Sequence, residues 1–155
     1  MPHIHKDIDF TVGAAIVHQG KILLVDHPRY GMRLMPGGHV ELTEDIDQAL
    51  LREIREETGL GPDDTEVVAE RIDPDDAGDA KPLWVPRWMN IHPANLPHRH
   101  MALMYLVRAK TDRVKLDGDE HQEIRWFAPR DLGDSSLAIP PDVRWYAREA
   151  IRILS

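Results

Sequence analysis

The chain contains no cysteine among its 155 residues. No disulfide framework can form, which excludes the small extracellular folds that depend on one and suits a reducing compartment. The sequence also lacks any run of about 18 consecutive apolar residues, the length that a membrane-spanning helix requires. Its first residues carry no apolar signal segment. We therefore expect a cytoplasmic protein without a membrane partner.

Positive charge is scarce as well, with 19 Lys and Arg against 27 Asp and Glu and a net charge of -8. General nucleic-acid binding needs clustered Lys and Arg to replace counterions, so we do not expect a nucleic acid as partner. An acidic protein that acts on a phosphate compound instead needs a bound cation. The length and the 42% apolar content predict one domain, residues 1–155. Whether the protein forms a homodimer stays open.

The most informative stretch runs from residue 38 to residue 60, and its second half predicts an amphipathic helix. Successive residues of a helix are about 100° apart around its axis. One arc of this helix collects the apolar residues Ile46, Leu50, Leu51 and Ile54. The neighbouring edge collects three carboxylates, which we call the glutamate edge: Glu53, Glu56 and Glu57. Thr43 is the predicted N-cap, and Gly59 is placed where a left-handed C-terminal cap belongs.

The glutamate edge allows two interpretations. In the first, Arg52 and Arg55 neutralise the carboxylates by salt bridges on a solvated helix face. In the second, the carboxylates bind a metal ion, because carboxylates three and four residues apart repel one another and lose hydration beside a core. Oxygen ligands with positions left for water suit Mg²⁺ or Mn²⁺. The glycines that flank the helix favour the metal site.

This stretch resembles the Nudix box at every defining position. The matching residues are Gly38, then Glu44 after five residues, then the run from Arg52 to Leu60 after seven more. The resemblance implies a Nudix-type α/β/α sandwich, with a mixed sheet between helices. It also implies metal-dependent hydrolysis of a diphosphate linkage in a small molecule, a nucleoside diphosphate joined to another group.

The resemblance also implies individual roles. Glu53, Glu56 and Glu57 would hold the metals, the backbone of Gly38 would approach them, and Arg52 would orient the glutamates. Glu44 would either contact the metal-binding residues without contacting the metal itself or place a negative charge at the helix start. Glu120, in the acidic loop before Trp126, is the first choice for an additional metal ligand, and Glu123 is the second. Either Glu53 or Glu120 would act as general base, and the sequence does not decide between them.

Substrate contacts are expected from the variable loops. Arg33 and Tyr30 precede the box, while Trp88 and His100 lie in later segments, and surface or packing roles stay open for all four. A separate metal hypothesis concerns His98 and His100, because alternate residues of a strand share one face and could bind Zn²⁺ or Ni²⁺. His92 is the third histidine of this group.

Five segments read as strands: residues 10–18, 21–26, 65–72, 84–92 and 101–109. A sixth strand is expected at the end of the segment 117–127, after its acidic loop. Gln19 and Gly20 predict a hairpin turn between the first two, and residues 93–100 read as irregular. The segment 84–92 contains Pro86 and reads as an edge strand. A final amphipathic helix is expected to begin with Asp142 as its cap and to pack on the sheet.

The predicted function is that of a nucleotide pyrophosphohydrolase. The alternative is a Nudix-fold regulator that binds a nucleotide without cleaving it, although no carboxylate of the box is missing. A Nudix-fold isomerase of isoprenoid diphosphates would require cysteine chemistry that this chain lacks. The substrate remains open among nucleoside triphosphates, dinucleotide polyphosphates, ADP-ribose and nucleotide sugars.

Overall fold

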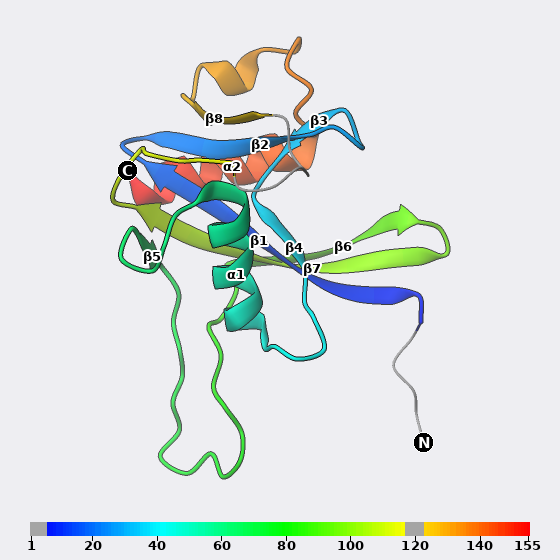
Figure 1. The fold of residues 1–155 in the computed structure, drawn as a ribbon, viewed down its shortest axis with the longest axis vertical. Helices are drawn as coiled ribbons and strands as arrows, with labels where there is room; N and C mark the ends of the chain where they lie inside the picture. The colour runs from blue at the N-terminus through cyan, green and yellow to red at the C-terminus, as the bar shows by residue number, and fades with distance from the viewer. Residues whose placement is uncertain (1–5, 117–122) are drawn as a thin grey trace.

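A computed structural model describes residues 6–116 and 123–155. These residues form an eight-stranded mixed sheet with one helix against each face (Figure 1). The predicted α/β class and the sandwich of a mixed sheet between helices are confirmed. The strands are β1 Ile8–His18, β2 Lys21–His27, β3 Met32–Leu34, β4 Gly37–His39, β5 Thr65–Val67, β6 Trp88–Asn95, β7 His98–Ala109 and β8 Glu123–Phe127. The helices are α1 Ile46–Thr58, α2 Pro141–Leu154 and the short 3₁₀ helix η1 Asp131–Gly133.

Strand β1 is the centre of the sheet. It runs parallel to β7 along almost its whole length, from the Ile8–Arg99 pair to the Val17–Arg108 pair. Towards its end it pairs antiparallel with β2, and near its start it pairs antiparallel with β4. Strands β4 and β2 therefore pair with successive parts of β1 on the same edge. Just before β4, the chain contacts the middle of β1, where the Ala14 N–H donates to the Pro36 carbonyl oxygen at 2.8 Å.

The predicted hairpin is confirmed, and the strand predicted for residues 84–92 is present but begins only at Trp88. Two further predictions are wrong. Residues 93–100 are not irregular, because β6 continues to Asn95 and β7 begins at His98. The strand predicted for residues 65–72 ends at Val67. Both errors concern one edge of β7. Residues His98 to Met104 of that edge pair with β6, so only the end of β7 is left for β5.

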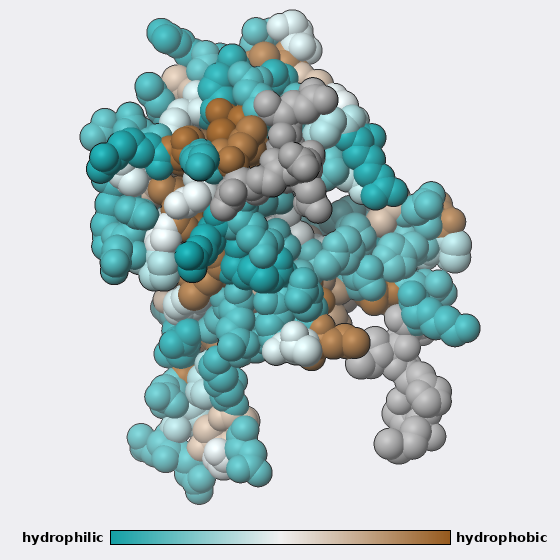
Figure 2. Space-filling model, in the orientation of Figure 1, coloured by the Kyte–Doolittle hydropathy of each residue, from teal (hydrophilic) through white to brown (hydrophobic). Residues whose placement is uncertain are grey.

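A long loop between β5 and β6 projects from the body of the molecule and is mostly hydrophilic on the side that Figure 2 shows. The buried Asp47 of α1 forms hydrogen bonds near both ends of this loop. The Asp47 carboxylate accepts from the Arg71 guanidinium at 2.6 Å and from the Trp84 backbone N–H at 3.1 Å. Among the described residues, no helix is long and apolar enough to cross a membrane.

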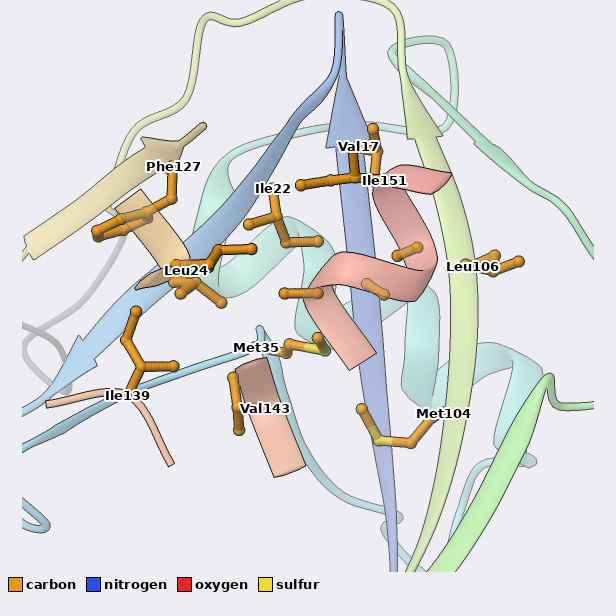
Figure 3. Packing of buried hydrophobic residues seen from close by; sticks show 14 of the residues in the cluster. Val17, Ile22, Leu24, Met35, Met104, Leu106, Phe127, Ile139, Val143 and Ile151 are labelled. Atoms are coloured by element: carbon orange, nitrogen blue, oxygen red, sulfur yellow. The ribbon is translucent and has the colours of Figure 1, made fainter. Parts of the chain in front are cut away.

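The core lies in two layers because alternate residues of β1 and β7 point to opposite faces. One face packs against α2, where Figure 3 shows Met104 and Leu106 of β7 with Val143 and Ile151 of α2. The other face packs against α1 through another set of buried residues, which includes Val12, Ile16, Leu50, Ile54 and Leu103. Helix α1 is thereby fixed on the sheet by its apolar arc, which leaves the edge beside that arc to form the site.

The predicted helix starts are both wrong by a short distance. Asp45, not Thr43, is the N-cap of α1: its side chain accepts from Gln48 N–H at 2.9 Å, and the Gln48 side chain accepts from Asp45 N–H at 2.9 Å. This reciprocal pair satisfies two helix-end donors at once, more than a single hydroxyl can. Helix α2 begins at Pro141, whose fixed φ suits a first helical position, so Asp142 lies inside the first turn.

Gly59 ends α1 as predicted. Its φ is 73°, in the left-handed region, and its N–H donates to the Arg55 carbonyl oxygen. Glycine adopts this conformation without the steric cost that a Cβ brings.

Candidate active site

A cleft of about 760 Å³ opens beside β4 and contains the whole glutamate edge of α1. The β4 glycines, Gly37 and Gly38, also line it. Much of the rest of the lining comes from the end of β2 and the loop after it, from β6 and β7, and from the start of α2. These residues include His27, Arg29, Tyr30, Asn90, His92, His100, Asp142 and Tyr146. The carboxylates thus face a space large enough for a nucleotide-sized ligand.

Glu53 is the most perturbed carboxylate of the glutamate edge. Its side chain is only 13% exposed, and its Oε1 accepts from Arg52 Nη1 at 2.9 Å. Loss of hydration, with repulsion from Glu57, raises the pKa of Glu53 to about 7, against the lowering effect of Arg52. A carboxyl with a pKa near neutrality exchanges a proton easily at physiological pH.

Glu57 and Glu56 occupy opposite extremes of exposure on the same edge. Glu57 is buried, and its Oε2 accepts from the backbone N–H of Gly37 at 2.9 Å. Glu56 is 57% exposed in its side chain and accepts from Arg52 Nη1 at 3.0 Å. The three carboxylates therefore extend from the protein interior to the open cleft.

Arg52 connects the glutamate edge to the loop before α1. Its Nε and Nη2 donate to the two carboxylate oxygens of Glu44 at 3.0 and 2.7 Å. Nη1 donates to Glu53 and to Glu56, and Nη2 also donates to the His39 carbonyl oxygen at 3.0 Å. A guanidinium has five N–H donors, so every donor of Arg52 is used inside the protein. Bonding to Glu44 raises the pKa of Arg52 and lowers that of Glu44, which keeps both groups charged.

The two β4 glycines leave room for different neighbours. A Cβ on Gly37 would overlap the Val12 carbonyl oxygen and lie 2.9 Å from the Gly13 Cα, both backbone atoms of β1. A Cβ on Gly38 would overlap the carboxylate of Glu53, with its Cδ at 2.6 Å. Gly37 is thus required for the approach of two strands, and Gly38 for the position of Glu53.

We expect Gly38→Ala to fold normally and to lose activity by about a hundredfold, because a shift of about 1 Å in a catalytic group costs that much. Gly37→Ala should instead destabilise the protein by about 3 kcal/mol or more, since backbone atoms cannot rotate away. Thermal melting and turnover of the two variants check this pair. Equal melting temperatures with equal turnover would contradict both assignments.

The donor set fits a hard divalent cation. Three carboxylates offer six oxygen atoms within one cleft, and the lack of a side chain at Gly38 leaves room for the Glu53 carboxylate beside the backbone. Oxygen ligands with open positions for water are what Mg²⁺ and Mn²⁺ prefer. The salt-bridge interpretation is also partly realised, because Arg52 contacts two of these glutamates.

The NUDIX domain model matches residues 9–149 of this sequence. The chain belongs to the Nudix family. It is similar to the crystal structure of a hydrolase of the NUDIX family from Clostridium perfringens, with a TM-score of 0.83 and 26% identity over 95% of this chain and 98% of that one. The resemblance carried by residues 38–60 is therefore confirmed.

Two curated relatives differ in the compound that their names contain. CTP pyrophosphohydrolase of Escherichia coli is 31% identical over 86% of this chain and 84% of that protein. ADP-ribose pyrophosphatase of Methanocaldococcus jannaschii is 44% identical, over 34% of this chain and 32% of that protein. The match to the latter thus spans about a third of the relative's length.

The substrate residues expected in this Nudix chain separate into two pairs. Tyr30 and His100 line the cleft. Arg33 and Trp88 do not line it: Arg33 Nη2 lies 3.4 Å from the Glu123 carboxylate, and Trp88 packs against Trp145 and against Tyr146, whose ring does line the cleft. Glu120 lies outside the described residues.

Arg29, which the sequence offered with Tyr30 and Arg33 as a contact for phosphate or base, lines the cleft with its guanidinium 6.0 Å from the Tyr30 ring. Sequence reasoning missed His27, the last residue of β2, whose ring lies 4.5 Å from that of Tyr30. His39 was also missed, although it directly follows Gly38. Burial, with the neighbouring His39, His92 and His98, lowers the pKa of His100 and favours its neutral form.

Proposed function

We propose that this Nudix protein hydrolyses a diphosphate linkage in a nucleoside diphosphate derivative, in a reaction that depends on Mg²⁺ or Mn²⁺. One observation carries the proposal: Glu53, Glu56 and Glu57 meet the β4 glycines in one cleft, where Arg52 holds two of the three carboxylates. A cluster used only for salt bridges would not need a large open space in front of it.

Glu53, Glu56 and Glu57 would hold the metal. When bound, such an ion neutralises phosphate oxygens and lowers the pKa of a coordinated water molecule. The buried Glu57 is positioned by the Gly37 N–H, and the exposed Glu56 reaches the solvent side of the cleft. The same residues would thus fix the site from within while leaving its outer side open to an anionic substrate.

Glu53 is our first choice for the group that takes a proton from the attacking water. Burial is the chief cause that raises its pKa to about 7 in the metal-free protein. A bound cation would lower this pKa, so the base must be the glutamate that the metal holds least tightly. Arg52 holds Glu53 through Nη1 and is itself held by both oxygens of Glu44, so the chain orients this carboxylate through a fixed network. Glu120, which the sequence left as an equal candidate for the base, is our second choice.

Tyr30 and Arg29, which also line the cleft, suit a nucleoside. Tyr30 is 49% exposed, which leaves its ring free to stack on a base, a contact worth about 1 to 3 kcal/mol. Arg29 beside it adds a positive charge that could attract phosphate. Because the similar proteins are named for CTP and for ADP-ribose, both compound types belong among the candidates.

A substrate panel tests this proposal. The purified protein is incubated with Mg²⁺ and with CTP, other nucleoside triphosphates, ADP-ribose, a dinucleotide polyphosphate or a nucleotide sugar, while phosphate, pyrophosphate and nucleoside monophosphate are measured. We expect hydrolysis of a P–O–P linkage in at least one of these compounds. Both EDTA and the substitution Glu56→Gln should abolish this activity. Arg55→Gln, which changes an exposed charge on the same helix, is the matched control and should keep full turnover. Tight binding of one compound without turnover would favour the regulatory alternative instead.

A further inference from the structure

Four side chains with metal-binding atoms meet on one face of the sheet, and we call them the histidine cluster: Asp9, His39, His98 and His100. Their meeting follows from strand register. Asp9 of β1 pairs with His100 of β7, and Thr11, two residues further along β1, pairs with His39 of β4. Residues two apart on a strand point to the same face, so Asp9, His98 and His100 share the side on which His39 lies. Figure 1 shows the β6–β7 hairpin extending beside the start of β1.

The distances within the histidine cluster match those between ligands of one ion. The Asp9 Oδ2 lies 2.9 Å from His98 Nε2 and 3.2 Å from His39 Nε2. The Nε2 atoms of His39 and His100 are also 3.2 Å apart, and donor atoms of Asp9, His98 and His100 all lie within 4.8 Å of one another. Ligands bound tetrahedrally at about 2.0 to 2.1 Å from a metal are separated by roughly 3.3 Å.

Hydrogen bonds alone satisfy this arrangement poorly. One ring nitrogen carries either a proton or a lone pair, yet His39 Nε2 faces both the Asp9 carboxylate and the His100 Nε2. With a proton, His39 must share its single N–H between Asp9 and His100, which weakens both contacts. Without a proton, it accepts from His100 but turns a lone pair towards the carboxylate. A cation in the centre would be attracted by all these lone pairs at once.

We infer that the histidine cluster binds a divalent transition-metal ion, such as Zn²⁺, at a site separate from the glutamate edge. Imidazole nitrogens with one carboxylate suit Zn²⁺, Ni²⁺ or Cu²⁺, whereas Mg²⁺ prefers the oxygen ligands of the glutamates. The side chains of His39, Asp9 and His98 are 56%, 43% and 29% exposed, so an ion can enter from solvent. His39 and His100 also line the cleft, which places the bound ion at its margin.

His92 supports the site from a neighbouring strand. Its ring lies 5.4 Å from that of His100, and its Nδ1 contacts the Asn90 side-chain oxygen at 2.8 Å. Such a contact, with Nδ1–H donating, leaves Nε2 with a lone pair, as in histidines that bind metals through Nε2. None of the residues of the histidine cluster belongs to the glutamate edge. Metal binding by this cluster can therefore be tested without any substrate and separately from the proposed hydrolysis.

Zinc binding is measured by equilibrium dialysis with saturating Mg²⁺ present, so that the glutamate edge is already occupied. All proteins carry His3→Gln and His5→Gln, which removes two further histidines of the sequence as ligands. We expect one Zn²⁺ per chain. Asp9→Asn and His98→Gln, which change different strands, should each weaken Zn²⁺ binding by at least about ten- to a hundredfold.

Two matched controls should keep zinc affinity. His18→Gln removes a histidine from the opposite end of β1, and Glu56→Gln removes a carboxylate of the glutamate edge. A rise in the melting temperature of the parent protein on adding Zn²⁺ in Mg²⁺ gives a second measurement if one variant fails to fold. Unchanged zinc affinity in both Asp9→Asn and His98→Gln, zinc affinity lost through Glu56→Gln, or no bound zinc would each overturn the inference.

Discussion

Magnesium should stabilise the wild-type protein by about 2.7 kcal/mol at a hundredfold excess over its dissociation constant, and Glu57→Gln should lose most of this gain. The magnitude follows from the binding of an ion to the folded state alone. Glu57 is the buried member of the glutamate edge, and its carboxylate faces Gly37 at 2.9 Å. The amide oxygen of glutamine can still accept from Gly37, so the substitution removes charge and leaves the local fold.

The same variant separates the two interpretations of the glutamate edge. In EDTA, Glu57→Gln should be as stable as wild type or slightly more stable, because Glu57 repels Glu53 and raises its pKa. If the glutamates served only salt bridges, which Arg52 makes with Glu53 and Glu56, Mg²⁺ would change the stability of neither protein specifically. Melting both proteins in EDTA and in Mg²⁺ decides the matter. A Mg²⁺ response of Glu57→Gln equal to that of wild type would exclude Glu57 as a ligand.

Glu53→Gln should reduce turnover by about 10² to 10⁴, the usual loss when a general base is removed. Glutamine keeps the size of the side chain and an oxygen that can accept from Arg52, so the fold and the substrate KM should change little. Arg55→Gln again serves as the control on the same helix. Turnover close to that of wild type would transfer the role of base to another group, with Glu120 as the next residue to substitute.

The raised pKa of Glu53 makes the free energy of unfolding of the metal-free protein depend on pH. Its pKa rises from 4.5 to about 7 on folding, so the folded state holds the proton more tightly than the unfolded state. The stabilisation of the protonated group is therefore lost as pH rises from about 4.5 through 7, by at most about 3 kcal/mol. Denaturant unfolding in EDTA at about pH 5 and pH 8 should show this loss in wild type. Glu53→Gln should lack it, and the same loss in both proteins would assign it to other groups.

The site could be predicted from the sequence to the extent that it lies on one helix. The spacing of Glu53, Glu56 and Glu57 places them together on any helix that buries Ile54, because helical geometry is local. The resemblance to the Nudix box added the fold and the family. Local competition between capping groups was harder to judge: Asp45 with Gln48 replaces Thr43 as the cap through a reciprocal pair of hydrogen bonds.

The sequence by itself determined the glutamate edge, its flanking glycines and the family to which the chain belongs. Only the tertiary structure decided that Gly37 accommodates β1 while Gly38 accommodates Glu53, and that burial raises the pKa of Glu53. The tertiary structure was also needed to show that Asp9 and His39 lie beside His98 and His100. The physical reason is that register between strands depends on pairing across about ninety residues of chain, as between Asp9 and His100, and side-chain periodicity does not encode which residues pair.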